Sequence, residues 1–419
     1  MNGMKKILFL ICLFSLSFYS CAIRNALAPK DNLDAERTFI AQRINNGNSE
    51  GYFNISSQLV KITDKLAIYL QNGGNISLYG LNKMAQEFDY YYDDMTNIYG
   101  GHSDIDANGK IIIVLMDINV QKIGTTTLAY FNPNDMHGNN QGEILYMDLS
   151  NANYNIDKSI GTLIHEFQHL INYSYYTSGK RGAMSSWLNE ALSESTSILF
   201  NKTTAESRIG EFNGINYYCF YTWNLPTITN NSKVNSLVNY PSASVFMHWL
   251  YNKNGNKSDI FKNIAQSREN TDYNKVLTAA KGISSLSGIS SWEDLLLTWM
   301  DDIVSNGLTP NWDGSKKATN DLATGNVTLY PGAMVVFNNY SESTKNNIVT
   351  RTNTKSGSKI IVLNKDTTLG GTAVSTKTVS GSSSVDLARS RKRVNIAEKK
   401  EENQIINILL DENGNIKKY

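Results

Sequence analysis

The fold of this 419-residue chain is decided by one stretch, which reads Ser159-Ile160-Gly161-Thr162-Leu163-Ile164-His165-Glu166-Phe167-Gln168-His169-Leu170-Ile171. On a helix, where successive residues turn by about 100°, its apolar residues form one continuous stripe. The polar residues gather on the opposite side, and they are Thr162, His165, Glu166 and His169. This pattern predicts a helix that is anchored by its apolar stripe and points two histidines into the space beyond it.

The two histidines have the spacing of a metal site. His165 and His169 are one helical turn apart, so both imidazoles can reach a single ion. Glu166 is offset around the helix and can act on a water molecule instead of binding the ion. Together they form the His-Glu-x-x-His arrangement, in which a carboxylate base stands beside a two-histidine zinc site.

A second stretch offers the third protein ligand that a catalytic zinc site needs besides its open position. It reads Trp187-Leu188-Asn189-Glu190-Ala191-Leu192-Ser193-Glu194, with two carboxylates one turn apart on one face of a helix. Glu190 can bind the ion, while Glu194 can accept the outer N–H of a ligating histidine and so fix its tautomer. Two carboxylates on one face repel each other unless one of them meets a cation.

Chance is the alternative to a metal site, because most single histidines in proteins are structural. The chain has five histidines, and two of them lie here on the polar face of a strongly amphipathic helix. The downstream pair, Glu190 and Glu194, is a second and independent match, so the sequence favours zinc binding. A zinc-binding protein without activity stays open as an interpretation, because a blocked substrate cleft would leave these residues in place.

With these two stretches the chain resembles the gluzincin, or thermolysin-like, metallopeptidases, and is most similar to the hyicolysin family of bacterial peptidases. The resemblance covers roughly residues 60–305 and includes three further stretches, 104–116, 130–135 and 240–246. It implies that His165, His169 and Glu190 bind one Zn2+ ion. It also implies that Glu166 serves as general base toward a zinc-activated water and later as proton donor. Glu194 would orient a ligand, and it stands where thermolysin has Asp.

Peptide hydrolysis also needs a donor for the oxyanion that forms at the scissile carbonyl. Tyr240 and His248 are candidates because they lie on the next helical segment, and the alternative is that both are packing residues. A peptide substrate is expected to add to an edge strand in the extended conformation. Residues 144–147 are the candidate for that edge.

The rest of the chain predicts an α+β fold around this site. Residues 55–99 have a helical pattern, with apolar residues at spacings of three and four at Leu59, Ile62, Leu66 and Leu70. Residues 111–116 are an apolar, β-branched run typical of a buried strand. Further short strands are expected at 128–131, 144–147, 334–337 and 359–363. Two helices are expected within 157–200, and others at 242–251, 258–266 and 292–304.

These elements predict a zincin core in two parts. Residues 55–180 would form an N-terminal subdomain with a mixed sheet and the first zinc helix, and residues 181–308 a mostly helical subdomain that supplies Glu190. Residues 309–419 would form a β-rich C-terminal module and a charged tail. The expected function is zinc-dependent hydrolysis of peptide bonds in proteins outside the cytoplasm. The alternative is a catalytically inactive zincin-fold surface lipoprotein that acts as a binding or adhesion protein.

The first 20 residues have the pattern of an export signal. Lys5 and Lys6 precede an apolar run from Ile7 to Tyr19, which is too short to span a bilayer. The signal ends in Ser20-Cys21, which resembles a bacterial lipobox and predicts a lipid on Cys21. Residues 21–54 would then be a tether to the membrane. The alternative is ordinary cleavage near Ser20 that leaves Cys21 as a free thiol.

Charge and loop composition limit the partners. The net charge is +1 with no basic stripe, which argues against nucleic acid, and we expect a monomer. The loop Asp104-Ile105-Asp106-Ala107-Asn108-Gly109 resembles the start of a Ca2+ loop. Leu115 stands where such a loop needs Glu, so a polar turn that enters a strand is the favoured interpretation.

Overall fold

The computed structural model describes residues 33–45, 48–120, 127–138, 140–220, 238–310, 312, 316–340, 347–367 and 374–376. The predicted export signal, the lipid site at Cys21 and the charged tail lie outside these residues. Among the described helices, none combines the length and apolarity needed to cross a bilayer.

The N-terminal half is built on a mixed sheet of six strands in the order β1-β2-β3-β4-β6-β5. The strands are β1 (Glu36–Asn45), β2 (Asn48–Ile62), β3 (Leu66–Gln71), β4 (Ile111–Met116), β5 (Ala129–Phe131) and β6 (Ile144–Asp148). Strands β3, β4 and β6 run parallel, while the β1–β2, β2–β3 and β5–β6 pairs are antiparallel. The mixed sheet is the one that the sequence predicts.

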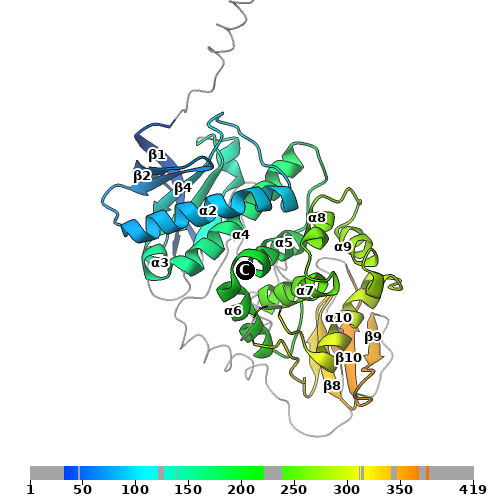
Figure 1. The fold of residues 1–419 in the computed structure, drawn as a ribbon. Coiled ribbons are helices and arrows are strands. Elements are labelled where there is room, and N and C mark those ends of the chain that lie inside the picture. Colours follow the sequence, from blue (N-terminus) through cyan, green and yellow to red (C-terminus); the bar gives the residue numbers. More distant parts are fainter. Residues whose placement is uncertain are drawn as a thin grey trace, which may run out of the picture.

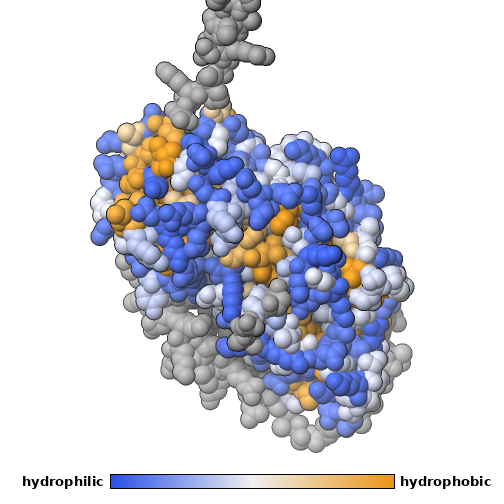
Figure 2. Space-filling model, viewed as in Figure 1, coloured by the Kyte–Doolittle hydropathy of each residue, from blue (hydrophilic) through white to orange (hydrophobic). Residues whose placement is uncertain are grey.

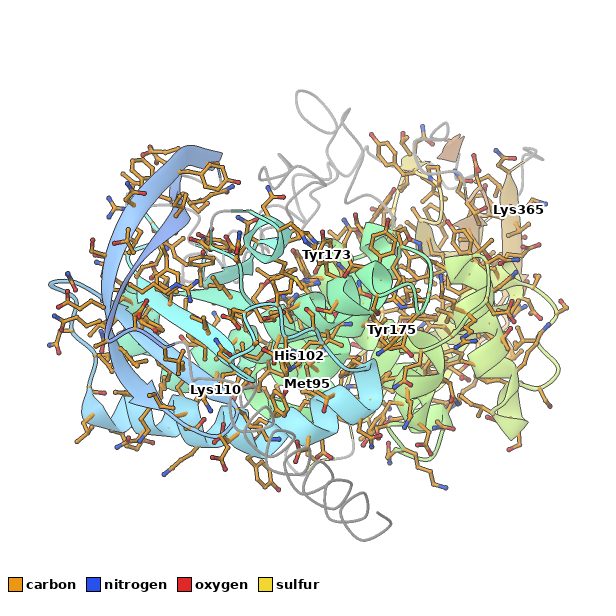
Figure 3. The ribbon with its side chains drawn as sticks, turned by 90° about the horizontal axis from the view of Figure 1, so that it is seen from above. Met95, His102, Lys110, Tyr173, Tyr175 and Lys365 are labelled. Atoms are coloured by element: carbon orange, nitrogen blue, oxygen red, sulfur yellow. The ribbon has the colours of Figure 1, made fainter. Side chains whose placement is uncertain are left out.

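Strand β4 is buried on both faces, which explains its unbroken apolar sequence. Ile111, Ile113 and Leu115 belong to the large core shared with the helices. The alternate residues Ile112 and Val114 face a smaller core that includes residues of β1 and β3. This second core exists because the β1–β2 hairpin curls over the sheet at one end of the molecule (Figure 3).

Helices cover the other face of the sheet and continue into the second half (Figure 1). In the N-terminal half these are α2 (Leu78–Tyr99), α3 (Leu149–Tyr154) and α4 (Ile156–Thr177), with a short 3-10 turn η1 (Pro133–Met136). The second half contains α5 (Ser186–Phe200), α6 (Lys202–Asn213), α7 (Asn239–Lys253), α8 (Asp259–Ala265), α9 (Asp272–Lys281), η5 (Ser284–Leu286) and α10 (Trp292–Asn306).

The C-terminal module is β-rich, with a three-stranded sheet in the order β8-β10-β9 and a two-stranded ribbon. The strands are β7 (Val327–Leu329), β8 (Met334–Asn338), β9 (Ile348–Thr352), β10 (Lys359–Asn364) and β11 (Val374–Thr376). Arg351 of β9 pairs with Asp294 of α10 at 2.6 Å between Nη2 and Oδ1, which ties this module to the helical half.

The prediction of a helix at residues 55–71 is wrong, because these residues form β2 and β3. Leu59, Ile62, Leu66 and Leu70 have helical spacing, but the turn after Ile62 places the first two and the last two on different strands. Ile62 is also half exposed, so it is no part of an apolar helix face. The prediction that residues 21–54 are only a tether is also wrong in part. Residues 36–45 form β1 and residues 48–54 begin β2, and the two strands pair with each other, for example through Gln42 and Tyr52.

A second correction concerns the edge of the sheet. The sequence suggested residues 144–147 as the edge strand, but β6 lies inside the sheet between β4 and β5. The edge on this side is β5, which runs antiparallel to β6 and leads directly into the loop that begins at Asn132. Figure 2 shows one face of the molecule, which is largely hydrophilic, with one apolar patch over β1 and β2 and another near its middle.

Candidate metal centre and active site

Helix α4 is held in place by its apolar stripe. Asn155 caps its first turn by accepting a hydrogen bond from the Lys158 amide at 3.0 Å. The whole stripe lies in the large core, and its members are Ile160, Leu163, Ile164, Phe167, Leu170 and Ile171. The opposite face of α4, which carries both histidines, is therefore held toward α5.

Helix α5 is fixed at its start and in its middle. The amide and hydroxyl of Ser185 both donate to the Asp272 carboxylate of α9, at 2.6 and 2.5 Å. Further along, the Ser195 hydroxyl lies 2.8 Å from the Tyr99 hydroxyl at the end of α2. These contacts set the position of Glu190, which projects from the same helix toward α4.

Three side chains converge from the two helices. Glu190 Oε2 lies 3.4 Å from His165 Nε2, and Glu190 Oε1 lies 3.6 Å from His169 Nε2. The three residues each offer one ligand atom within 4.8 Å of the others. Donors that surround a zinc ion tetrahedrally at about 2.0–2.1 Å are roughly 3.4 Å apart. The spacing of this donor set therefore fits one zinc ion.

Burial and unpaired atoms support the same interpretation. Within the described residues, His169 Nε2 and both carboxylate oxygens of Glu190 are buried without a hydrogen-bond partner. Leaving such atoms unpaired is costly, and a metal ion would satisfy all of them. Burial, the other histidine and Arg208 hold the pKa of His165 well below its usual range, and burial lowers that of His169 to about 4. Both rings are thus neutral at pH 7, as metal binding requires.

Glu166 lies beside this donor set and is held by the edge strand. Its Oε2 accepts a hydrogen bond from the Phe131 amide of β5 at 3.1 Å, while its Oε1 is buried without a hydrogen bond among the described residues. Burial raises the pKa of Glu166 well above its usual range, although the Phe131 amide acts in the opposite direction. One oxygen of the carboxylate is thus fixed and the other can exchange a proton.

Glu194 contacts the outer side of His165, with 3.6 Å between Oε1 and Nδ1. It is also held by a buried ion pair with Arg208 of α6, at 2.8 Å from Nε to Oε2 and 3.0 Å from Nη2 to Oε1. Arg208 further contacts Glu211 at 2.9 Å. Arg208 is the cation that two carboxylates on one face of α5 need, and the sequence analysis did not identify it.

His169 has its own outer partners, which the sequence analysis also missed. Ser193 Oγ lies 3.0 Å from His169 Nδ1. Burial lowers the pKa of His169, and the neighbouring Asn189 side chain acts in the opposite direction. Asn189 directly precedes Glu190, so its place in the sequence next to a ligand was the available signal. Each histidine is therefore contacted on its outer nitrogen.

The two oxyanion candidates are placed differently. The Tyr240 ring stacks on the Arg208 guanidinium, with 4.8 Å from Cζ to the ring centroid, so it borders the site through Arg208. His248 lies two helical turns further along α7, which is about 12 Å. Within the described residues its ring contacts are with Trp312 and Tyr251, at 5.0 and 6.4 Å between centroids. Tyr240 thus contacts Arg208, the partner of Glu194, and the role of both candidates stays a prediction.

The loop at Asp104 has the internal bonds of a polar turn. The amide and side chain of Asn108 donate to Asp106, and the Gly109 amide donates to Asp104 at 3.0 Å. Asp104, Asp106 and Glu143 each bring one carboxylate oxygen within 4.8 Å of the others. Burial and the neighbouring Glu143 raise the pKa of Asp106 to about 6. These bonds match the turn interpretation, and Ca2+ binding stays a prediction.

Comparison with known proteins supports a metallopeptidase family for this chain. No family model matches it. Over 206 residues the chain is 29% identical to the neutral metalloprotease ShpI of Staphylococcus hyicus, a match that covers 45% of this chain and 45% of that protein. The chain thus spans less than half of this relative. The curled mixed sheet is consistent with an α+β metalloprotease, and the cluster of His165, His169 and Glu190 is compatible with a zinc site.

Proposed function

We propose that the chain is a zinc-dependent metalloendopeptidase of the thermolysin-like, hyicolysin type. The observation that carries the proposal is the donor set of His165, His169 and Glu190. The Glu190 oxygens lie 3.4 and 3.6 Å from the Nε2 atoms of the two histidines. Both of these oxygens and His169 Nε2 are buried without a hydrogen bond among the described residues. Glu166 lies on the same helix as the two histidines, and one of its carboxylate oxygens makes no hydrogen bond among the described residues. A purely structural four-ligand site would have no use for such a group.

The residues divide the chemistry between them. A zinc ion held by the three donors would supply Lewis-acid chemistry, activating a water molecule and polarising the scissile carbonyl. Glu166 Oε1 takes the proton from the attacking water and delivers it to the leaving amine nitrogen. The Phe131 amide keeps Oε2 fixed during both proton transfers. Burial raises the pKa of Glu166, which helps its carboxyl group to hold the proton after the first transfer and before the second.

The position of the edge strand supports an extended peptide as substrate. Strand β5 ends at Phe131, whose amide binds Glu166, so a peptide added along β5 would run past the base and the metal donors. Main-chain hydrogen bonds to an edge strand bind extended peptides without demanding a particular side chain. Tyr240, which borders the site through Arg208, stays the candidate for binding the oxyanion.

The export and anchoring of the protein are part of the proposal. The N-terminal pattern that ends at Cys21 supports an exported lipoprotein, monomeric and facing substrates outside the cytoplasm. Metabolic labelling with a palmitate analogue tests this point, because Cys21→Ser should abolish the label. Labelling of the Cys21→Ser variant at the wild-type level would contradict the anchor.

Casein digestion tests the activity. The wild-type protein should cleave casein, and a chelator should stop cleavage until zinc is restored. Glu166→Gln should bind zinc normally and lose activity by at least about 100-fold, because general-base catalysis contributes that much or more. Glu293→Gln, on α10, is the matched control and should keep wild-type activity. Equal activity of Glu166→Gln and wild type would contradict the mechanism, and zinc binding without any cleavage would support the inactive binding-protein alternative.

A further inference from the structure

Four aromatic rings from three elements meet beside the proposed active site. Phe131 ends β5, His137 follows the turn η1, and Tyr173 and Tyr176 lie in the last turns of α4. Tyr173 is at the centre of the group. Its ring centroid lies 6.0 Å from those of Phe131 and His137 and 6.4 Å from that of Tyr176. We call these four residues the aromatic cluster.

The aromatic cluster is partly open to solvent. His137 and Tyr176 are exposed and Tyr173 is half-buried, whereas Phe131 is buried in the large core. Tyr173 lies near the junction of the two halves of the molecule (Figure 3). Apolar residues that are exposed singly are ordinary, but a contiguous group of them is typical of a binding surface. The cluster is therefore a candidate for contact with a ligand.

The aromatic cluster continues the strand along which we propose that the substrate binds. The Phe131 amide donates to Glu166 at 3.1 Å, so one residue contacts the proposed base and also belongs to the cluster. After Phe131 the chain enters η1 at Asn132 and reaches His137 at the end of that turn. A peptide that extends along β5 past Phe131 would therefore meet the rings of the cluster.

Helix α4 sets the distance between the aromatic cluster and the chemistry. Tyr173 and Glu166 are seven positions apart on α4, so they differ by only about 20° around the helix and share one face. Tyr173 is about 6 Å beyond His169 along the axis and about 10 Å beyond Glu166. An extended peptide advances about 3.3 Å per residue. The cluster thus lies roughly two or three substrate residues from the bond to be cleaved.

The chemistry of the aromatic cluster indicates which side chain it would bind. Aromatic rings pair favourably with other rings, edge to face or offset, and also contribute a large apolar surface. Successive side chains of an extended peptide point to opposite sides, so the cluster would contact one of them and not its neighbours. Phenylalanine, tyrosine and leucine side chains fit this description, and glycine offers nothing for the rings to contact.

We propose that the aromatic cluster is a specificity site, which binds one aromatic or large aliphatic side chain of the peptide substrate. Tyr173 is its specificity-determining residue, because its ring contacts the other three. The inference rests on the proposed function, since it assumes that a peptide runs along β5 and is cleaved at the metal centre. It adds the class of peptide that the site selects.

A structural role is the competing explanation, because Tyr173 also packs between β5 and the end of η1. A residue that only supports the fold affects every substrate alike. A specificity residue affects only those peptides whose side chain it contacts. Two peptides that differ at a single position therefore separate the two explanations.

The experiment begins with a peptide library, whose products identify the position that prefers aromatic residues. Two matched peptides, with phenylalanine or glycine at that position, then give kcat/KM. The wild type should favour the phenylalanine peptide by at least about 10-fold, the scale that an apolar contact provides. Tyr173→Ala should reduce this ratio to within about twofold and leave kcat/KM for the glycine peptide unchanged. Tyr173→Phe keeps the ring and should keep the ratio.

A second variant and a control accompany Tyr173→Ala. His137→Ala removes a ring of the cluster from an exposed position, so it should lower the ratio without lowering the melting temperature. Tyr154→Ala is the matched control. Tyr154 is an exposed tyrosine at the end of α3, and it precedes α4 at about 25 Å along the helix from Tyr173. Its replacement should leave the ratio unchanged.

Glu166→Gln supplies a measurement that needs no cleavage. By calorimetry this variant should bind the phenylalanine peptide more tightly than the glycine peptide, and adding Tyr173→Ala should remove the difference. The inference is overturned if the wild type cleaves without this preference, if the preference survives Tyr173→Ala, or if Tyr173→Ala slows both peptides equally. Preferential binding without cleavage by the wild type would refute the proposed function and keep the inference. Neither cleavage nor preferential binding would refute both.

Discussion

The buried pair of Arg208 and Glu194 allows a quantitative prediction. Both side chains are at most 5% exposed, and two N–O contacts of 2.8 and 3.0 Å join them. Replacing Arg208 with Met leaves Glu194 as a buried charge without its counterion. Removing one partner of such a pair typically costs about 3–5 kcal/mol. We expect Arg208→Met to lower the free energy of unfolding by that amount at pH 8.

The loss should be smaller at low pH, since burial raises the pKa of Glu194 and Arg208 works in the opposite direction. Without Arg208 that pKa rises further, so Glu194 takes up a proton and the uncompensated charge disappears. Urea denaturation of the zinc-free protein at pH 8 and pH 5 measures the difference. A loss that is equal at both pH values would contradict an electrostatic origin.

A double-mutant cycle then isolates the pair. The double variant Arg208→Met/Glu194→Leu replaces both charges with apolar groups, an exchange that is often close to neutral in stability. We expect its loss of unfolding free energy to be smaller than the sum of the losses of the two single variants by at least about 2 kcal/mol. Additivity within about 0.5 kcal/mol would refute the reasoning. The double variant should still bind zinc about 10–100-fold more weakly, because His165 has lost its outer partner.

Three further predictions concern the core, the edge loop and the metal. Gly161→Ala should cost about 1–3 kcal/mol in thermal melts, because its Cβ would lie 2.7 Å from the side-chain nitrogen of Asn201, which caps α6. Burial raises the pKa of Asp135 from 3.8 to about 7. Folding therefore favours its protonated form, so stability should fall as pH rises from about 4 to 7, by at most about 4 kcal/mol. Asp135→Asn should flatten this pH profile. Zinc at about 1,000 times its dissociation constant should raise stability by about 4 kcal/mol, and a chelator should remove that gain.

The sequence predicted the metal helices well because their pattern is local. The stripe of α4 and the two pairs at one-turn spacing, His165 with His169 and Glu190 with Glu194, depend only on helical periodicity. The structure brings the inner atoms of His165, His169 and Glu190 together at 3.4–3.6 Å and places Glu194 against the outer nitrogen of His165 at 3.6 Å. Strand β4 was equally clear, because a strand buried on both faces shows a continuous apolar run.

The errors arose where the partner is distant or the pattern is mixed. In β2 the buried face includes Ser57, so the strand lacks a clean alternation of apolar and polar residues, and the spacing of Leu59 and Ile62 resembled a helix. Arg208 lies on a different helix from Glu194, and nothing in its local sequence indicates that they meet. The place of β6 inside the sheet depends on β5, whose three residues are too few to show a period.

The proposed donors also have a consequence for how the protein assembles. All three lie between residues 165 and 190, on helices that follow each other along the chain. Closing so short a segment costs little chain entropy, whereas Arg208 and the C-terminal strands must arrive from further away. A helical hairpin of α4 and α5 could therefore capture its metal before the rest of the chain has docked. Metal supply at the time of synthesis, and not only during turnover, would then determine the yield of native protein.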